Sequence, residues 1–324
     1  MTTTDATTTA DALARLQALP AHGVWSPVLT PVDTNYGIDE ARFVQQANWL
    51  LEHGCHGLAL FGTTSEANSF SVEERIGLLD AAIAAGLPAD RMMVGTGCNA
   101  ITDSVQLTAH AVSHGVRRVL MLPPFYYKDM SDEGLARAFG AVIERVNDPD
   151  LRVFLYHFPR LSDVPITLGL LDLLSERYGD TIAGVKDSSG DWSNTAAMIE
   201  RFPQMAIFPG SEIFLLQGLE AGGSGCITAT SNVNAAGSRA VWDAWAAGDA
   251  TEATARQDTA TAIRRALETE QPVPGQKWLI ASQRNDEAWR TVRPPMVELG
   301  DAEGAALLEA VQAAGFDPAS VALG

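Results

Sequence analysis

The chain has 324 residues, of which 46% are hydrophobic, enough for one large domain or two ordinary ones with a sizeable core. Its formal net charge of −18 argues against nucleic acid or an anionic membrane as a partner, because the summed field repels both. We therefore expect a small-molecule substrate, and any anionic group on it must be met by local donors.

The cysteines and the first residues bear on the cellular location. Cys55, Cys98 and Cys226 are widely spaced and form no C-x-x-C pair, so neither a disulfide framework nor a zinc site is expected. A reducing cytoplasm is the simplest location. No apolar run approaches the roughly 20 residues of a membrane span, and residues 1–22 are predicted to form a loose N-terminal tail without signal-peptide features.

Eight short apolar segments recur along the chain, and each is followed by a polar turn and a helical pattern. They are nearly continuous in apolar character, which is typical of parallel strands covered on both faces. The intervening helices carry start signals, such as the S-x-x-E capping box of Ser71 and Glu74. The eight segments are residues 24–30, 57–62, 91–97, 118–124, 152–158, 182–188, 206–211 and 225–230.

Eight strand–helix units match a (β/α)8 TIM barrel, for which about 250 residues is typical. The rival is a doubly wound open sheet, but no G-x-G-x-x-G turn follows the first strand. From about Asp249 the pattern becomes wholly helical. The sequence therefore predicts an α/β barrel over residues 23–248 and a C-terminal helical extension over residues 249–324.

Lys186, one of only three lysines, follows the apolar "IAGV" near the end of the sixth predicted strand. Active sites of such barrels lie at the C-terminal ends of the strands. Burial favours the neutral form of a lysine, and a neutral amine is a nucleophile toward ketones. The alternative is an ion pair with Asp187, which is weakened because adjacent strand residues point to opposite faces.

Tyr156 occupies the matching late position of the fifth predicted strand. Neighbouring strands lie roughly 4.8 Å apart, so two inward-facing side chains at this level would meet. The phenol would then donate and accept protons beside the nucleophile. The alternative is a core tyrosine whose hydroxyl bonds to the backbone.

Two loops at strand ends are further candidates. In "GTTSE", Gly62 permits a tight turn, and the amides and hydroxyls of Thr63 and Thr64 suit a carboxylate. In "PPFYYKD", Tyr126 belongs to a rigid aromatic corner that is either simply exposed or a subunit contact.

Two histidine pairs have near-helical spacing, His53 with His56 and His110 with His114. Neither pair has a glutamate placed as in H-E-x-x-H, and no acidic cluster is evident near them in the sequence. We therefore predict packed or solvated histidines and no metal site.

Taken in order, the motifs at successive strand ends resemble those of the dihydrodipicolinate synthase / N-acetylneuraminate lyase family. The resemblance extends from about residue 24 to the C-terminal "VRPPMVEL". The motifs are "TP" at 30–31, "GTTSE", "PPFYYK", "LYHFP", "GVKDSSGD" and "GSGCITATSN".

The resemblance implies a class I, Schiff-base-forming pyruvate aldolase. Lys186 matches the lysine that forms an imine with the keto carbon, and Tyr156 matches the tyrosine that shuttles protons. Thr63 matches the hydroxyl that joins this tyrosine in a relay, and Tyr126 matches a tyrosine contributed by a neighbouring subunit. The resemblance further implies a homotetramer built as a dimer of dimers, a 2-keto acid substrate, and no cofactor or metal beyond the covalent lysine imine.

Substrate-binding residues follow from the same resemblance. Thr63 and Thr64 match the loop that grips the carboxylate, and Ile227 matches the position whose carbonyl lines the pyruvyl site. Arg160 is one residue earlier than the arginine of the synthase branch, which binds the second substrate's carboxylate. Glu212 fits the region that binds the polyhydroxyl tail in the lyase branch.

Three departures from the family pattern bear on the substrate. Ser65 replaces the glycine of G-T-T-G-E, His157 replaces the asparagine of Y-N-x-P, and Ser211 does not fit the lyase branch. Together with the offset of Arg160, they favour an aldolase or dehydratase acting on pyruvate or a 2-keto-3-deoxy acid. The alternative is 4-hydroxy-tetrahydrodipicolinate synthase, which condenses pyruvate with aspartate semialdehyde.

Two other classes stay open on the sequence alone. One is a barrel that binds a phosphorylated substrate and uses acid–base chemistry, which needs a phosphate loop after strand seven or eight. The other is a non-catalytic sensor that retains the pyruvyl pocket only for binding.

Overall fold

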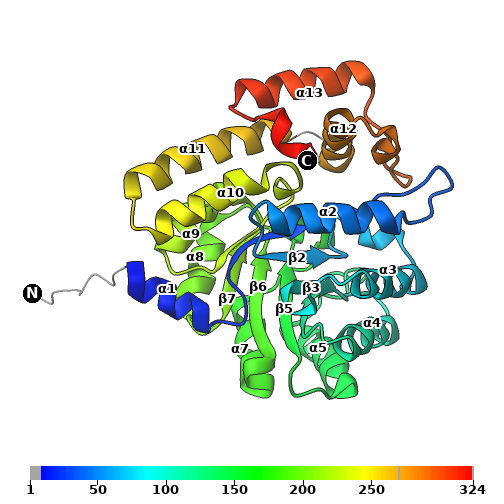
Figure 1. Cartoon of the computed structure of the whole chain (residues 1–324). Coiled ribbons are helices and arrows are strands. Elements are labelled where there is room, and N and C mark those ends of the chain that lie inside the picture. The colour runs from blue at the N-terminus through cyan, green and yellow to red at the C-terminus, as the bar shows by residue number, and fades with distance from the viewer. Residues whose placement is uncertain (1–8, 269–270, 323–324) are drawn as a thin grey trace, which may run out of the picture.

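The computed structural model describes residues 9–268 and 271–322, and these residues form a barrel of parallel strands surrounded by helices (Figure 1). The strands follow the order β7-β6-β5-β4-β3-β2-β1-β8. A hydrogen bond of 2.8 Å from the Ser224 amide to the Ile207 carbonyl links the two ends of the sheet. The predicted (β/α)8 barrel is confirmed. The strands are β1 Gly23–Pro27, β2 Gly57–Leu60, β3 Met92–Gly95, β4 Arg118–Met121, β5 Arg152–His157, β6 Ile182–Asp187, β7 Ala206–Pro209 and β8 Gly225–Ile227.

Helices cover the outside of the barrel, and the start signal in the sequence before α3 is confirmed. Both hydrogen bonds of the capping box between Ser71 and Glu74 are formed at the start of α3. The helices of the barrel are α2 Glu40–Glu52, α3 Val72–Ala84, α4 Ile101–Ser113, α5 Asp132–Val146, α6 Pro159–Ser162, α7 Leu168–Tyr178, α8 Trp192–Arg201, α9 Leu215–Glu220 and α10 Ser231–Ala246. No described helix has both the length and the apolar character needed to cross a membrane.

The N-terminal segment differs from the prediction of a loose tail. Residues Thr9–Ala18 form helix α1, in which Leu16 is buried in the core. The Arg15 guanidinium donates a hydrogen bond of 2.9 Å to the carbonyl of Pro203. A helix of 10 residues is only marginally stable in water by itself, so its packing on the barrel stabilises it. Residues 1–8 of the predicted tail lie outside the described residues.

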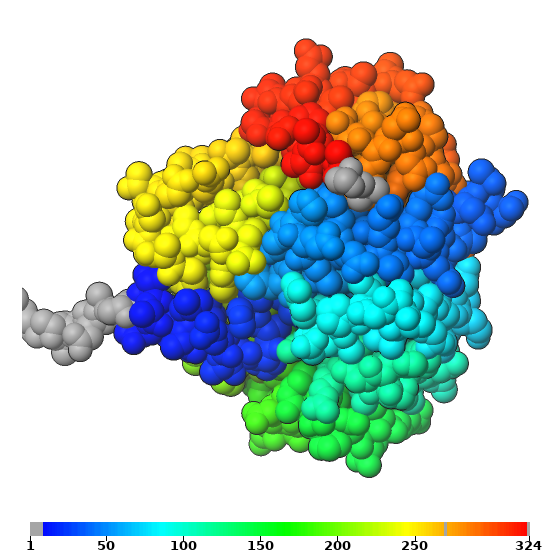
Figure 2. All heavy atoms as spheres, viewed as in Figure 1, coloured from blue at the N-terminus to red at the C-terminus, as the bar shows by residue number. Residues whose placement is uncertain are grey.

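The C-terminal extension consists of α11 Ala250–Leu267, α12 Pro272–Arg284 and α13 Asp301–Ala313. It has its own apolar cluster, which includes Ile263, Leu279 and Trp289 and is continuous with Leu29 at the barrel mouth. Figure 2 shows α12 and α13, coloured orange to red, seated directly on the blue N-terminal part of the barrel, whereas α11 is yellow. The extension therefore covers the side of the barrel on which the strands end.

A β-bulge sets the register between β5 and β6. Val153 pairs with Ile182 but Phe154 pairs with Gly184, so β6 contains one extra residue. The shift brings Tyr156 level with Lys186, whereas the preceding register would pair Tyr156 with Val185. A one-residue slip turns a side chain to the other face, so the bulge is what places both groups inside the barrel.

Candidate active site

A cavity of about 300 Å³ opens where the strands end. Its walls come from β1, β5, β6, β8, the loops after β2, β5, β6, β7 and β8, and helices α6, α8, α11 and α12. Of the residues predicted from the sequence to have catalytic or binding roles, those that line the cavity are Thr63, Thr64, Tyr156, Arg160, Lys186 and Ile227. The structure thus brings six residues from five separate segments to one site.

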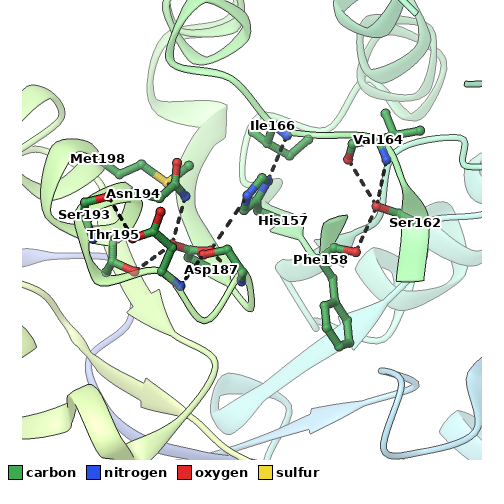
Figure 3. A network of polar contacts seen from close by, with 12 residues as sticks. His157, Phe158, Ser162, Val164, Ile166, Asp187, Ser193, Asn194, Thr195 and Met198 are labelled. Carbon is green, nitrogen blue, oxygen red and sulfur yellow. Dashed lines mark hydrogen bonds and ion pairs between the residues drawn. The ribbon is translucent and has the colours of Figure 1, made fainter. Parts of the chain in front are cut away.

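Lys186 is almost fully enclosed, with 4% of its surface exposed. Its Nζ lies 4.4 Å from the centroid of the Tyr156 ring. The buried Asp187 carboxylate is occupied by other donors: the Thr195 hydroxyl at 2.6 Å, the Asn194 amide at 2.9 Å and the Ser189 backbone amide at 2.9 Å (Figure 3). The lysine is therefore left facing the cavity and an aromatic ring.

The Tyr156 hydroxyl lies 3.1 Å from Oγ1 of Thr63, and either oxygen can donate. The ring of Tyr156 stacks on Phe158, with 5.7 Å between the centroids. The hydroxyl is therefore bonded to a side chain of the cavity wall, not to the backbone as in the alternative of a core tyrosine. The phenol and the threonine hydroxyl are thus hydrogen-bonded to each other, and the lysine amine lies over the face of the same tyrosine ring.

The loop that carries Thr63 and Thr64 is held by a buried carboxylate. Glu66 accepts a hydrogen bond of 2.6 Å from Nζ of Lys277 and one of 3.1 Å from the Arg293 amide. Both side chains of the Glu66–Lys277 ion pair are completely buried. Burial lowers the pKa of Lys277, and the charge of Glu66 opposes that shift. The extension thereby fixes the loop that faces the substrate cavity.

Neither Glu66 nor Lys277 was singled out in the sequence as a functional residue. The sequence did contain a signal, because Lys277, like Lys186, is a lysine within an apolar segment, "GQKWLI". Its partner is 211 residues away, so only the fold reveals the pair.

Tyr126 does not line the cavity of its own chain. Its side chain is 73% exposed and packs edge-to-face on Tyr127, with ring centroids 5.3 Å apart. The backbone amide of Tyr126 donates a hydrogen bond of 2.8 Å to Asn99, which fixes the corner. A role in the relay therefore requires a second copy of the chain.

Glu212 does not line the cavity either. Its carboxylate is fully buried, accepts a hydrogen bond from the Thr228 hydroxyl and lies 4.0 Å from the Arg264 guanidinium. The residues of this segment that line the cavity are its neighbours Gly210, Ser211, Ile213 and Phe214. The structure thus does not bring Glu212 to the position expected of a substrate-binding residue.

Arg264 is a cavity residue that the sequence analysis missed. It projects from α11, donates a hydrogen bond of 3.2 Å to the Thr230 hydroxyl and pairs with Glu268 at 3.1 Å. Its place in an ordinary polar helix carries no sequence signal. With Arg160 it puts two guanidinium groups at the mouth of the cavity, although the whole chain is strongly acidic.

His157, which departs from the family pattern, faces the outer helices instead of the cavity (Figure 3). Its Nδ1 accepts a hydrogen bond of 2.9 Å from the Ile166 amide, and its Nε2 lies 4.0 Å from Asp187. Burial lowers the pKa of His157, and the Asp187 carboxylate opposes that shift. A neutral ring at this position supports the segment between α6 and α7.

The two histidine pairs behave differently. His53 stacks on an indole and bonds to a backbone carbonyl, and His56 accepts a backbone N–H, so this pair is packed as predicted. His110 and His114 both lie at hydrogen-bond distance from the carboxylate of Asp80. The sequence shows no acidic cluster near these histidines, but the fold brings them one carboxylate, that of Asp80 from a different helix.

Comparison with known proteins gives a consistent result. The Dihydrodipicolinate synthetase family matches residues 20–314. An uncharacterized DapA-like lyase of Chloroflexus aurantiacus is 35% identical, over 90% of this chain and 96% of that protein. The structure is similar to dihydrodipicolinate synthase from Agrobacterium tumefaciens, with a TM-score of 0.82, 29% identity, and coverage of 90% of this chain and 99% of that one. A prophage protein of the dihydrodipicolinic acid synthase family from E. coli K12, in complex with pyruvate, has a TM-score of 0.84 at 26% identity, with coverage of 91% and 99%.

Proposed function

Because this chain belongs to the dihydrodipicolinate synthetase family and is a lyase, we propose that Lys186 forms a Schiff base with pyruvate or a 2-keto-3-deoxy acid. The observation that carries the proposal is the enclosed Lys186 amine beside Tyr156, whose hydroxyl is bonded to Thr63. The relative from E. coli K12 in complex with pyruvate supports this choice of ligand.

The proposed reaction begins when the Lys186 amine adds to the keto carbon, which then loses its oxygen as water to give a protonated imine. The imine draws electrons from the bond between C3 and C4, so cleavage releases an aldehyde and leaves an enamine. A proton added to C3 and hydrolysis of the imine release pyruvate and restore the amine. Tyr156 moves the protons of these steps, and Thr63 relays them.

The other cavity residues have binding roles in this proposal. The hydroxyls and amides of Thr63 and Thr64 hold the carboxylate of the keto acid, and the Ile227 carbonyl lines the pyruvyl site. Arg160 faces the part of the cavity that receives the remainder of the substrate. No metal or cofactor takes part, because the imine itself supplies the electron sink.

The alternative function is 4-hydroxy-tetrahydrodipicolinate synthase, the activity of the relative from Agrobacterium tumefaciens. One observation favours it: Arg160 reaches the cavity in spite of its one-residue offset, and its guanidinium suits the carboxylate of aspartate semialdehyde. The two functions share the lysine imine and differ in the second reactant.

We further propose a cytoplasmic homotetramer in which Tyr126 completes the relay of a neighbouring copy. The exposed aromatic corner around Tyr126 supports a subunit contact. The unpaired thiols of Cys55, Cys98 and Cys226 are consistent with a reducing compartment.

Reductive trapping tests the proposal. Borohydride added with pyruvate is expected to modify only the peptide that contains Lys186, and the Lys186→Met variant is expected to give no adduct. The chain supplies its own controls, because Lys128 and Lys277 are its only other lysines. A wild-type enzyme that cleaves a keto acid without any trapped adduct would refute the Schiff base. Assays with 2-keto-3-deoxy acids, and with pyruvate plus aspartate semialdehyde, then separate the two functions.

A further inference from the structure

A cluster of ligating side chains lies on the outer helical layer, away from the cavity. His110 and His114 are one helical turn apart at the end of α4, and Asp80 projects from the neighbouring α3 (Figure 1). The Nε2 atoms of His110 and His114 lie 2.8 Å and 3.0 Å from the same Oδ1 atom of Asp80. One atom from each of the three residues can thus serve as a ligand, and these atoms all lie within 4.8 Å of one another.

We propose that Asp80, His110 and His114 bind one transition-metal ion of the Zn²⁺ type. Imidazole nitrogens and a carboxylate oxygen are common zinc ligands, at about 2.0–2.2 Å from the metal. Tetrahedral ligands at that bond length lie about 3.4 Å from one another. Two of the separations in the cluster are 2.8 Å and 3.0 Å, and none exceeds 4.8 Å, so small side-chain rotations suffice to admit the ion.

The chemistry of the cluster selects among cations. Two imidazoles and one carboxylate suit Zn²⁺ and similar ions, whereas Mg²⁺ and Ca²⁺ prefer sites made only of oxygen ligands. On binding, the ring proton of each neutral histidine resides on Nδ1, which leaves the Nε2 lone pair for the metal. Water completes the coordination.

The surroundings also favour a cation. His110 lies in the last turn of α4 and His114 caps its C-terminus, where the helix dipole is negative. The side chains of His110, His114 and Asp80 are 21%, 32% and 49% exposed, respectively. An ion therefore reaches the site from solvent without any opening of the fold. A bound ion would join α3 to α4 and stabilise the folded state.

Calorimetric titration of the full chain, free of any affinity tag, with ZnCl₂ alone tests the site. We expect one ion per chain, a higher melting temperature in the presence of Zn²⁺, and no comparable binding of MgCl₂. Asp80→Asn and His114→Gln are expected to remove both the single-site isotherm and the thermal shift. These substitutions are on the surface and nearly isosteric, and circular dichroism verifies the fold.

Glu73→Gln is the matched control, since it removes an exposed carboxylate from the same helix α3 outside the cluster. This variant is expected to bind Zn²⁺ like the wild type. Failure of the wild type to bind one ion, or equal binding by the wild type, Asp80→Asn and His114→Gln, would overturn the proposal. Neither result affects the lysine imine, which is tested separately.

Discussion

The Tyr156 hydroxyl is the group on which the proposed proton transfers depend, and Tyr156→Phe removes that group alone. The ring remains, with its stacking on Phe158 and its contact with Lys186 at 4.4 Å. A positioned acid–base group contributes about 10²–10⁴ in rate, which corresponds to about 3–5.5 kcal/mol of barrier. The lost hydrogen bond to Thr63 costs only about 1 kcal/mol of stability. The variant should therefore lose turnover while it stays folded.

The assay follows pyruvate release from a keto acid that the wild type cleaves, with unfolding in urea measured in parallel. Thr63→Val is the matched comparison, because it keeps the shape of the side chain and removes its hydroxyl, which is the second oxygen of the relay and one of the proposed donors to the substrate carboxylate. We expect a smaller loss of turnover in Thr63→Val than in Tyr156→Phe. If Tyr156→Phe retains turnover within about tenfold of the wild type, the assignment of its hydroxyl as the proton carrier is wrong.

Three further predictions concern stability. Lys277→Met leaves the Glu66 carboxylate buried without its cation and should cost about 3–5 kcal/mol in urea unfolding, most of which returns when Glu66→Gln is added. Burial, followed by the charge of a nearby arginine, lowers the pKa of His56 to about 4. Below pH 6.5 the unfolded chain therefore binds more protons than the folded chain. The free energy of unfolding should fall by up to about 3 kcal/mol between pH 6.5 and pH 4. Urea unfolding at a series of pH values should show a smaller decrease for His56→Gln than for the wild type. In Gly184→Ala the new Cβ would lie 2.1 Å from a backbone carbonyl of β7, so we expect a loss of about 1–3 kcal/mol and less trapped adduct, whereas Gly77→Ala meets nothing within 4 Å and should be tolerated.

The barrel was predictable because its strands are buried on both faces and so appear as short apolar runs in the sequence. The end of each run then located the cavity. Physical reasoning named Lys186, Tyr156, Thr63 and Thr64 as candidates beside structural alternatives, and the family resemblance then favoured their functional roles. The β-bulge between β5 and β6 was not predicted, although Gly184 lies at the register shift and a glycine inside a strand can mark a bulge. Yet the bulge decides that Tyr156 faces the same way as Lys186.

The residues that the sequence did not reveal depend on contacts between distant segments. Asp80 of α3 bonds to His110 of α4, and the two residues are 30 positions apart in the chain. Arg264 reaches the cavity only because α11 folds back over the barrel mouth. The helix at Thr9–Ala18 likewise depends on its packing against the barrel, and that packing cannot be predicted from so short a sequence.

The carboxylate of Glu66 has a consequence for how such enzymes can be recombined. It binds both the ammonium of Lys277 and the backbone amide of Arg293. The substrate loop and the C-terminal helices therefore depend on each other structurally. A chimera that joined this barrel to the C-terminal helices of a relative would work only if the graft supplied both donors. Exchange of parts among such lyases should therefore succeed most readily when the junction lies before Glu66 or after Arg293, which keeps all three residues in one parent.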